Sequence, residues 1–262
     1  MAGDIRMRLG VHNLDSGQVT AFRASYQQMM AISDNRGYQA LAGLHGVPNW
    51  YCWHHQQNAH SAQQMQLFLP WHRAYLYNWE MAMRDRVPGV TLPWWDWTLL
   101  PPRQNGLPGI FTERLPAGAA NPLTGFRVNL PTTRPPVMRL TARSPGPLDG
   151  LPSQADVDDC LASTDWTDFN LKLEDLHDRV HGWVSGDMGV VGTAAYDPIF
   201  WSHHTMIDRI WSMWQSASGN VPPELLDVVL APFNMKVGDV LNVNSLGYDY
   251  AAGQSIIAVG GT

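Results

Sequence analysis

The sequence predicts a mainly α-helical protein, a four-helix bundle with long irregular loops and a few short strands. Three observations lead to this fold class. Apolar residues recur at helical spacing, residue types that favour helix starts precede several of these segments, and the intervening regions are rich in proline, glycine, asparagine and threonine. The four segments with helical character are residues 16–33, 67–87, 168–184 and 198–216.

The first two segments form the N-terminal half of the predicted bundle. Ser16 is a residue type that caps helix N-termini, and a shorter helical stretch, residues 37–46, follows after a break. In the second segment Leu76, Trp79 and Met83 recur at helical spacing, which places them on one face of a helix.

The C-terminal half contains the other two helices and the regions that join them. Pro198 suits the first turn of the fourth helix, where the backbone N–H that proline lacks would have no helical partner. Residues 101–155 read as irregular, and an insert of this length usually carries function or wraps the core as an extended arm. The tail from Val237 onward has some strand character.

Length and charge limit the class of protein. A chain of 262 residues suits one large domain or two small ones, and its net charge of -6 argues against a nucleic-acid partner or an anionic membrane surface. No segment approaches about eighteen uninterrupted apolar residues, and the start lacks the apolar stretch of a signal peptide. We therefore expect a cytoplasmic protein without a membrane span, although a mature form cut from a longer precursor, or secretion with a partner, would leave the same sequence.

Histidine is the residue type that stands out. The chain has ten histidines but only two cysteines, Cys52 and Cys160, which are too few for a disulfide framework or a thiolate metal cage. Any bound metal must therefore be held mainly by histidine.

The C-terminal histidines have the spacing of a metal site. His177 and His181 are four residues apart, so on a helix both imidazoles project from one face; a pair of surface histidines is the alternative. The next helix contains His203 and His204, whose side chains point about 100° apart, so we expect only one of them to face the first pair. Three imidazoles would leave a coordination position open for substrate or oxygen.

A second group of histidines lies in the N-terminal half. It comprises His45, His54, His55, His60 and His72. A single histidine would more often be a buried core residue, but two separate groups favour metal binding. All-imidazole sites suit zinc, copper, iron or nickel, and copper(II) binds most tightly in the divalent series. Residue chemistry alone leaves copper and zinc both open.

Several motifs resemble the type 3 copper family, which comprises tyrosinases, catechol oxidases and the oxygen-binding units of molluscan hemocyanins. The matching segments, in the family's order, are FLPWHRAYLYNWE, LPWWDW, LHDRVHGWVSGDM, DPIFWSHHTMIDRIW and LGYDY. The resemblance implies a single tyrosinase-like catalytic core domain over residues 1–262, without a C-terminal lid domain, and a bundle that holds two copper ions. Such a chain would receive copper as the free metal or from a copper chaperone.

Carried over position by position, the resemblance assigns ligands to each copper ion. Copper A would be held by His45 and His72, and copper B by His177, His181 and His204, the second of the paired histidines. The middle ligand of copper A departs from the family pattern.

This middle ligand has three candidates. Many family members place it nine residues before the third ligand, where this chain has Gln63. Fungal and molluscan relatives have a Cys-x-His motif with a thioether between the cysteine and the ligand, and Cys52 and His54 match that motif. We favour His54, then His60, then His55. Cys52 either forms the thioether or stays a buried thiol.

Carboxylates and an aromatic residue complete the predicted site. In the family, a carboxylate and the residue after the first copper B ligand hold a water linked to removal of the phenol proton. The residue in that position is Asp178, and the carboxylate is Asp168 or Glu174. A solvent-facing Asp178 paired with an arginine is the alternative. Phe200 would lie near the substrate entrance, which Gly182 would leave uncrowded.

The resemblance implies an enzyme that uses O2 as co-substrate to oxidise o-diphenols to o-quinones and to hydroxylate monophenols. Its partner would be a small phenolic or catecholic substrate. An o-aminophenol oxidase of the same family is one alternative, and a hemocyanin-like oxygen-binding protein is another. A dinuclear zinc hydrolase is a third, although its usual bridging carboxylates are not evident.

Overall fold

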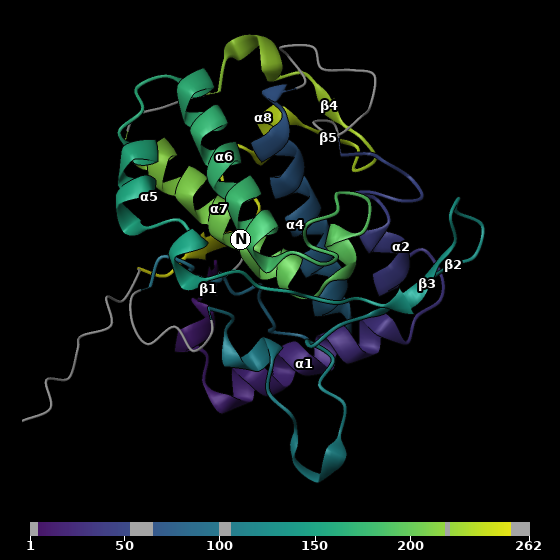
Figure 1. The fold of residues 1–262 in the computed structure, drawn as a ribbon. Helices are drawn as coiled ribbons and strands as arrows, with labels where there is room; N and C mark the ends of the chain where they lie inside the picture. Colours follow the sequence, from purple (N-terminus) through teal and green to yellow (C-terminus); the bar gives the residue numbers. More distant parts are fainter. Residues whose placement is uncertain (1–4, 53–64, 100–105, 218–220, 253–262) are drawn as a thin grey trace, which may run out of the picture.

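Four long helices dominate the computed structural model, which describes residues 5–52, 65–99, 106–217 and 221–252 (Figure 1). The helix α4 packs against α1, α6 and α7, and α1 crosses the lower end of the group (Figure 1). The predicted mainly α-helical fold class is therefore confirmed. The long helices are α1 (Ser16–Met30), α4 (Phe68–Arg86), α6 (Trp166–Val184) and α7 (Ile199–Ala217), and the short ones are α2 (Tyr38–Ala42), α5 (Gln154–Leu161) and α8 (Val237–Val240).

The start of α1 differs by one residue from the predicted cap. Asp15, not Ser16, is the N-cap: its carboxylate accepts the Gln18 backbone N–H at 2.8 Å, and the Gln18 side chain accepts the Asp15 N–H at 2.9 Å. This reciprocal pair satisfies two backbone donors that the helix leaves without partners. The helix ends at Met30, three residues before its predicted end, and only Tyr38–Ala42 of the following stretch is α-helical.

The two C-terminal helices lie close to their predicted positions. The helix α6 begins at Trp166 because Asp165 caps it, accepting the backbone N–H of Asp168 at 3.0 Å. The helix α7 begins at Ile199, directly after the proline predicted for its first turn. No helix in the described ranges combines the length and apolar character needed to cross a membrane.

The strands are short and occur in two-stranded pairs within the described residues. Two of the pairs are antiparallel, and the third, between β1 and β6, is parallel and joins the two ends of the described chain. The pairs are β1 (Arg6–Arg8) with β6 (Tyr248–Tyr250), β2 (Arg127–Leu130) with β3 (Val137–Leu140), and β4 (Val229–Leu230) with β5 (Met235–Lys236).

The described part of the predicted irregular region, from residue 106 onward, runs as an extended arm across the helices (Figure 1). It contains the β2–β3 hairpin and several 3-10 turns. The 3-10 turns of the described chain are Val11–Asn13, Gly109–Phe111, Pro116–Gly118, Leu148–Gly150, Ala194–Tyr196 and Pro223–Leu225. The arm ends where α5 begins at Gln154, so the predicted limit of residue 155 is correct to within a few residues.

A buried network of charged side chains ties the helices to the paired chain ends. Arg8 on β1 is fully buried, and its Nε donates to Glu80 of α4 at 2.7 Å. Its guanidinium lies 3.6 Å from the ring centroid of Tyr248 on β6. Leu92 N–H also donates to the Glu80 carboxylate at 3.1 Å, so this buried charge is paired and hydrogen-bonded.

The second half of the network joins α4 to α7. Arg73 Nε donates to Asp208 at 2.5 Å, and the Arg73 guanidinium lies 3.5 Å from the Trp211 ring. Tyr248 donates its hydroxyl to the same carboxylate at 2.7 Å. Burial acts to raise the pKa of Asp208, but the charges of Arg73 and Arg8 outweigh it and hold that pKa below its ordinary value.

Removing the Asp208 charge should destabilise the fold strongly. The Asp208→Asn variant leaves the buried guanidinium groups of Arg8 and Arg73 under-compensated, and we expect a loss of about 3–5 kcal/mol in the free energy of unfolding, measured by urea titration. The control is Asp34→Asn, which breaks an exposed pair with Arg36 and should leave the free energy of unfolding nearly unchanged. Equal losses in the two variants would contradict a structural role for the network.

Candidate metal centre

Helices α6 and α7 bring four histidines together at one point of the bundle. His177, His181, His203 and His204 each place a ring nitrogen within 4.8 Å of the other three. The Nε2 atom of His204 lies 3.2 Å from Nε2 of His177 and 3.3 Å from Nε2 of His181. Metal–nitrogen bonds of about 2.0 Å in tetrahedral geometry place ligand nitrogens about 3.3 Å apart, so these three atoms have the spacing of one metal's ligands.

The other ring nitrogens of the α6 pair are occupied, which leaves Nε2 to bind a metal. His177 Nδ1 lies 2.9 Å from the Asp178 carboxylate, and His181 Nδ1 lies 2.6 Å from the Met188 carbonyl oxygen. Both partners only accept hydrogen bonds, so each Nδ1 carries the proton and each Nε2 presents its lone pair.

Burial favours the neutral form of His181 and His204, which is the form that binds metals. It lowers the pKa of His181 to about 4, although the hydrogen bond to the Met188 carbonyl opposes the shift. The pKa of His204 also lies well below its ordinary value, first because of burial and then because of the neighbouring histidines.

His203 differs from the prediction that only one of the paired histidines faces α6. Its ring stacks on His177 with centroids 5.2 Å apart and lies 5.0 Å from His181. The imidazole is long enough that two adjacent side chains on α7 both reach the α6 pair. His204 nevertheless makes the short Nε2 contacts, so it fits the predicted ligand position better than its neighbour.

The second group of possible ligands comes from the N-terminal half. His45 follows α2, His72 lies on α4, and Cys52 joins them in a group whose ligand atoms lie within 4.8 Å of one another. His72 Nδ1 donates to the Phe68 carbonyl at 2.8 Å, and His45 Nδ1 donates to the Val191 carbonyl at 3.2 Å. As in the first group, these contacts leave Nε2 of both histidines for a metal.

Cys52 is fully buried, and its sulfur lies 3.8 Å from Nε2 of His72. The three candidates for the middle ligand, His54, His55 and His60, lie outside the described residues. Their ranking and the thioether to Cys52 therefore stay predictions.

The two groups face each other across α4 and α7. The rings of His72 and His204 stack with centroids 4.3 Å apart and planes at 18°. Phe200 packs on His204 at 4.0 Å and on His45 at 5.0 Å, and it is fully buried. It therefore fills space between the two groups, because the first turn of α7 is buried throughout, and its predicted place near the substrate entrance stays a prediction.

The three candidate carboxylates occupy different environments. Asp168 accepts the Ser163 hydroxyl at 2.6 Å and pairs with Lys172, and it precedes His177 by nine residues, or about 13 Å along a helix. The structure thus does not bring Asp168 to the histidines. Glu174 is half-buried and one turn before His177, and burial, followed by the charge of Asp178, raises its pKa to about 7.

Asp178 contacts His177 and not an arginine. Its side chain is 65% exposed, yet one oxygen holds His177 Nδ1. Arg179 pairs instead with Asp156, and Arg209 lies over the ring of Trp94. The predicted alternative of an Asp178–arginine pair is therefore not observed among the described residues.

The carbonyl partners of the histidines were not predicted. Met188 and Val191 act through backbone oxygens, which any residue type can supply, so their side chains carry no signal for this role. The glycines around them, Gly186, Gly189 and Gly192, indicate a tight loop but not its contacts.

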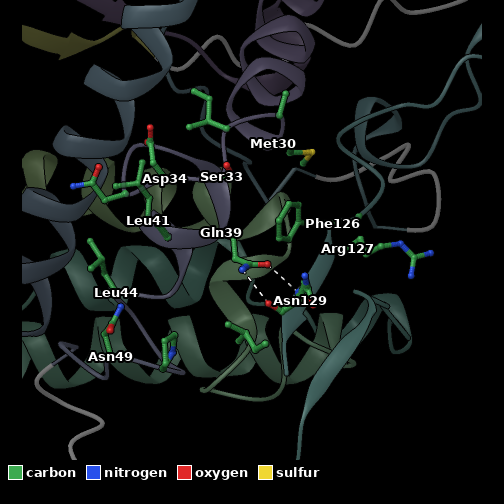
Figure 2. Close-up of a pocket in the computed structure, with 17 residues that line it drawn as sticks. Met30, Ser33, Asp34, Gln39, Leu41, Leu44, Asn49, Phe126, Arg127 and Asn129 are labelled. Atoms are coloured by element: carbon green, nitrogen blue, oxygen red, sulfur yellow. Dashed lines mark hydrogen bonds between the residues drawn. The ribbon is translucent and has the colours of Figure 1, made fainter. Parts of the chain in front are cut away.

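A cavity of about 820 Å³ lies elsewhere, between the C-terminal end of α1, the helix α2 and the strand β2 (Figure 2). At its wall Gln39 pairs with the backbone of Asn129, donating at 3.1 Å and accepting at 2.9 Å, as the dashed lines in Figure 2 show. None of the histidines of the two groups lines this cavity, so it is separate from the described part of the metal centre.

Comparison with known families agrees with the geometry. Residues 35–217 match the model of the common central domain of tyrosinase, which covers more than half of the chain. The chain belongs to the tyrosinase family of type 3 copper proteins, a family that implies a dinuclear copper site, and the two histidine groups fit it.

The relatives include both oxygen carriers and enzymes. The chain is 28% identical over 275 residues to a G-type hemocyanin of Enteroctopus dofleini, covering 95% of this chain but 9% of that protein. It is 32% identical over 173 residues to a tyrosinase of Streptomyces lincolnensis, covering 56% of this chain and 62% of the relative. The solved structure of an octopus hemocyanin functional unit superposes with a TM-score of 0.77 at 26% identity, covering 94% of this chain and 68% of that chain.

Copper content should distinguish the two histidines of the α7 pair. We expect His204→Ala to retain about half of the parent's copper, because a half-site with two remaining imidazoles binds weakly, and His203→Ala to retain about all of it. The measurement is copper per chain after removal of free metal. His12→Ala, at an exposed histidine outside both groups, is the control. The assignment is wrong if His203→Ala loses as much copper as His204→Ala.

Glu174 should make the metal-free protein less stable as the pH rises. Its pKa is raised from the ordinary 4.5 to about 7 in the folded chain, so the folded state binds more protons than the unfolded state between these values. The free energy of unfolding should therefore fall with pH across this window. Glu174→Gln should flatten that fall in urea titrations at pH 5 and pH 8, whereas Glu224→Gln, at an exposed position, should not. An unchanged slope in Glu174→Gln would contradict the shift.

Proposed function

We propose that this chain is a dinuclear copper oxidase that uses O2 to oxidise o-diphenols, and to hydroxylate monophenols, to o-quinones. The observation that carries the proposal is the open approach to His181. That histidine is only partly buried, and the next residue, Gly182, is exposed, with no neighbouring atom of the described residues within 4 Å of the position that a Cβ would take. An oxygen carrier needs access only for O2, whereas an oxidase must also admit the flat ring of its substrate.

The residues around this approach suit an aromatic substrate. Val190 and Val191 are 52% and 36% exposed and belong to the loop whose carbonyls contact His45 and His181. Their apolar side chains would contact the faces or edges of a phenolic ring, while buried Phe200 keeps water from the space between the histidine groups.

In this proposal His45 and His72 hold one copper ion, and His177, His181 and His204 hold the other, with a middle ligand of copper A from the undescribed segment. The copper pair, when bound, supplies O2 binding and accepts electrons from the phenolic ring. The protein holds the imidazoles of His45, His72, His177 and His181 in the metal-binding tautomer through their Nδ1 contacts, and it surrounds the pair with buried aromatic side chains.

Glu174 is the carboxylate that best suits removal of the phenol proton. A general base works best when its pKa lies near the operating pH, and Glu174 has a pKa of about 7 on the helix that carries His177 and His181. Asp178, which contacts His177, would orient that imidazole. Asp168, committed to Ser163 and Lys172, has neither role in this proposal.

Reversible oxygen binding is the second candidate, and the similarity to hemocyanins over nearly the whole chain favours it. The two candidates differ in turnover. An oxidase consumes O2 in proportion to quinone formed, whereas a carrier holds O2 without consuming it.

The decisive measurement is initial rates on copper-quantified protein with 4-methylcatechol, 4-methylphenol and 2-aminophenol. We expect sustained quinone formation from the catechol, slower turnover of the monophenol, and matching O2 consumption. Turnover of 2-aminophenol alone would assign the protein to the aminophenol oxidases. A stable oxygenated form with no turnover of any of the three substrates would reject the oxidase proposal.

Gly182 provides a graded test of where the substrate approaches. Gly182→Phe should lower kcat/KM for 4-tert-butylcatechol by about tenfold or more, because a ring would occupy the open space beside His181. Gly182→Ala is the matched control. It adds only one methyl group to open space, so its kcat/KM should stay near that of the parent. Bound copper should remain unchanged in both variants. Parent-like kcat/KM in Gly182→Phe would show that the substrate approaches elsewhere.

A further inference from the structure

One loop, residues 185–193, contacts a histidine in each of the two groups. The Met188 carbonyl accepts from His181 Nδ1 at 2.6 Å, and the Val191 carbonyl accepts from His45 Nδ1 at 3.2 Å. His181 lies near the end of α6, whereas His45 follows α2 in the N-terminal half. The two imidazoles are therefore oriented by carbonyls only three residues apart in one loop.

The loop also fixes the backbone next to His45. Val47 N–H donates to the Gly192 carbonyl at 3.0 Å. A Cβ on Gly46 would lie 2.5 Å from that same oxygen, so the two glycine backbones are in direct contact. A shift of the loop would thus move the position of His45 as well as the orientation of its ring.

A single buried carboxylate holds the loop in place. Asp187 is 1% exposed and receives both terminal nitrogens of Arg139, at 2.6 Å and 2.7 Å. The Ala142 N–H donates to it at 2.7 Å, and the Asp187 N–H donates to the Ala142 carbonyl at 2.9 Å. A two-pronged arginine–carboxylate pair fixes both distance and orientation.

The arm that carries Arg139 also supports the end of α6. Ser144 N–H donates to the Val184 carbonyl at 2.9 Å, and Gly146 N–H donates to the Trp183 carbonyl at 2.8 Å. These carbonyls belong to the last turn of α6, where the backbone carbonyl groups have no N–H partner within the helix. The arm therefore holds the loop at two points, the C-terminal end of α6 and the carboxylate of Asp187.

We propose that the Arg139–Asp187 pair is a positioning device that sets the two metal half-sites relative to each other. It acts through the loop carbonyls on His45 and His181, and neither member of the pair hydrogen-bonds to a histidine within the described residues. This inference rests on the copper ligands named in the proposed function. It does not depend on which substrate is oxidised or on whether turnover occurs.

A purely structural pair would affect stability alone, whereas a positioning pair must also affect the metals. Two Cu(II) ions held at bridging distance couple magnetically and give little EPR signal. If the two half-sites move apart or change their relative orientation, this coupling weakens and the ions give an EPR signal. The rate at which copper passes to a chelator reports how well each imidazole is oriented. Both readouts are independent of catechol oxidation.

The experiment compares Arg139→Met with Arg139→Lys, which retains the charge but not the two-pronged contact. The control is Arg36→Met, which removes an exposed arginine that pairs with Asp34 away from the loop. All proteins are loaded with copper, and the EPR-visible fraction and the rate of copper loss to EDTA are measured. We expect Arg139→Met to lose copper about tenfold faster than the parent, with a clear gain of EPR signal. Arg139→Lys should lie between the two, and Arg36→Met should match the parent.

Asp187→Asn provides a second variant, since it keeps an acceptor for the Ala142 N–H while removing the charge. It should reproduce the copper loss and EPR signal of Arg139→Met. The proposal is overturned if folded Arg139→Met or Asp187→Asn matches Arg36→Met in both readouts, even when its unfolding midpoint is lower. A parent protein that binds coupled copper but oxidises no catechol would refute only the proposed oxidase function.

Discussion

The ion pair between Arg73 and Asp208 is the interaction on which the rest of the centre depends. Arg73 directly follows His72 on α4, and Asp208 lies one turn after His204 on α7, so this 2.5 Å contact joins the two helices beside the histidines that they carry. Because both charges are buried, each has a large desolvation penalty that only close pairing and further hydrogen bonds can offset. That requirement limits how far α4 and α7 can slide along each other, and it keeps the ring centroids of His72 and His204 4.3 Å apart.

The histidines themselves are the second constraint on the fold. Neutral imidazoles with converging lone pairs do not stabilise one another, so the surrounding structure must hold them in place before any metal binds. For four of the rings it does so by placing an acceptor at Nδ1, as the Phe68 carbonyl does for His72 and the Met188 carbonyl for His181. The buried aromatic residues around the rings, such as Phe200, then exclude the water that would compete for these contacts.

The two half-sites differ in the number of separate chain segments that form them. The three nitrogens of His177, His181 and His204 come from two adjacent helices, and helix geometry alone sets the spacing of the first two. The half-site of His45 and His72 needs α4, the turn after α2 and the 185–193 loop together. This dependence on distant segments explains why the loop and its Asp187 anchor matter for the arrangement of both metals.

Much of the fold and part of the site follow from the sequence by itself. Helical periodicity located the four long helices, the spacing of His177 and His181 placed both on one face, and the family motifs pointed to a dinuclear copper protein, because these are properties of short segments. Tertiary packing decided the rest. It buried Phe200, kept Asp168 on Ser163 and Lys172, brought His203 to the α6 pair, and placed the Met188 and Val191 carbonyls on two histidines. Local patterns could not reveal these contacts, since a backbone carbonyl has no residue signature and the direction of a side chain depends on which distant surface packs against it.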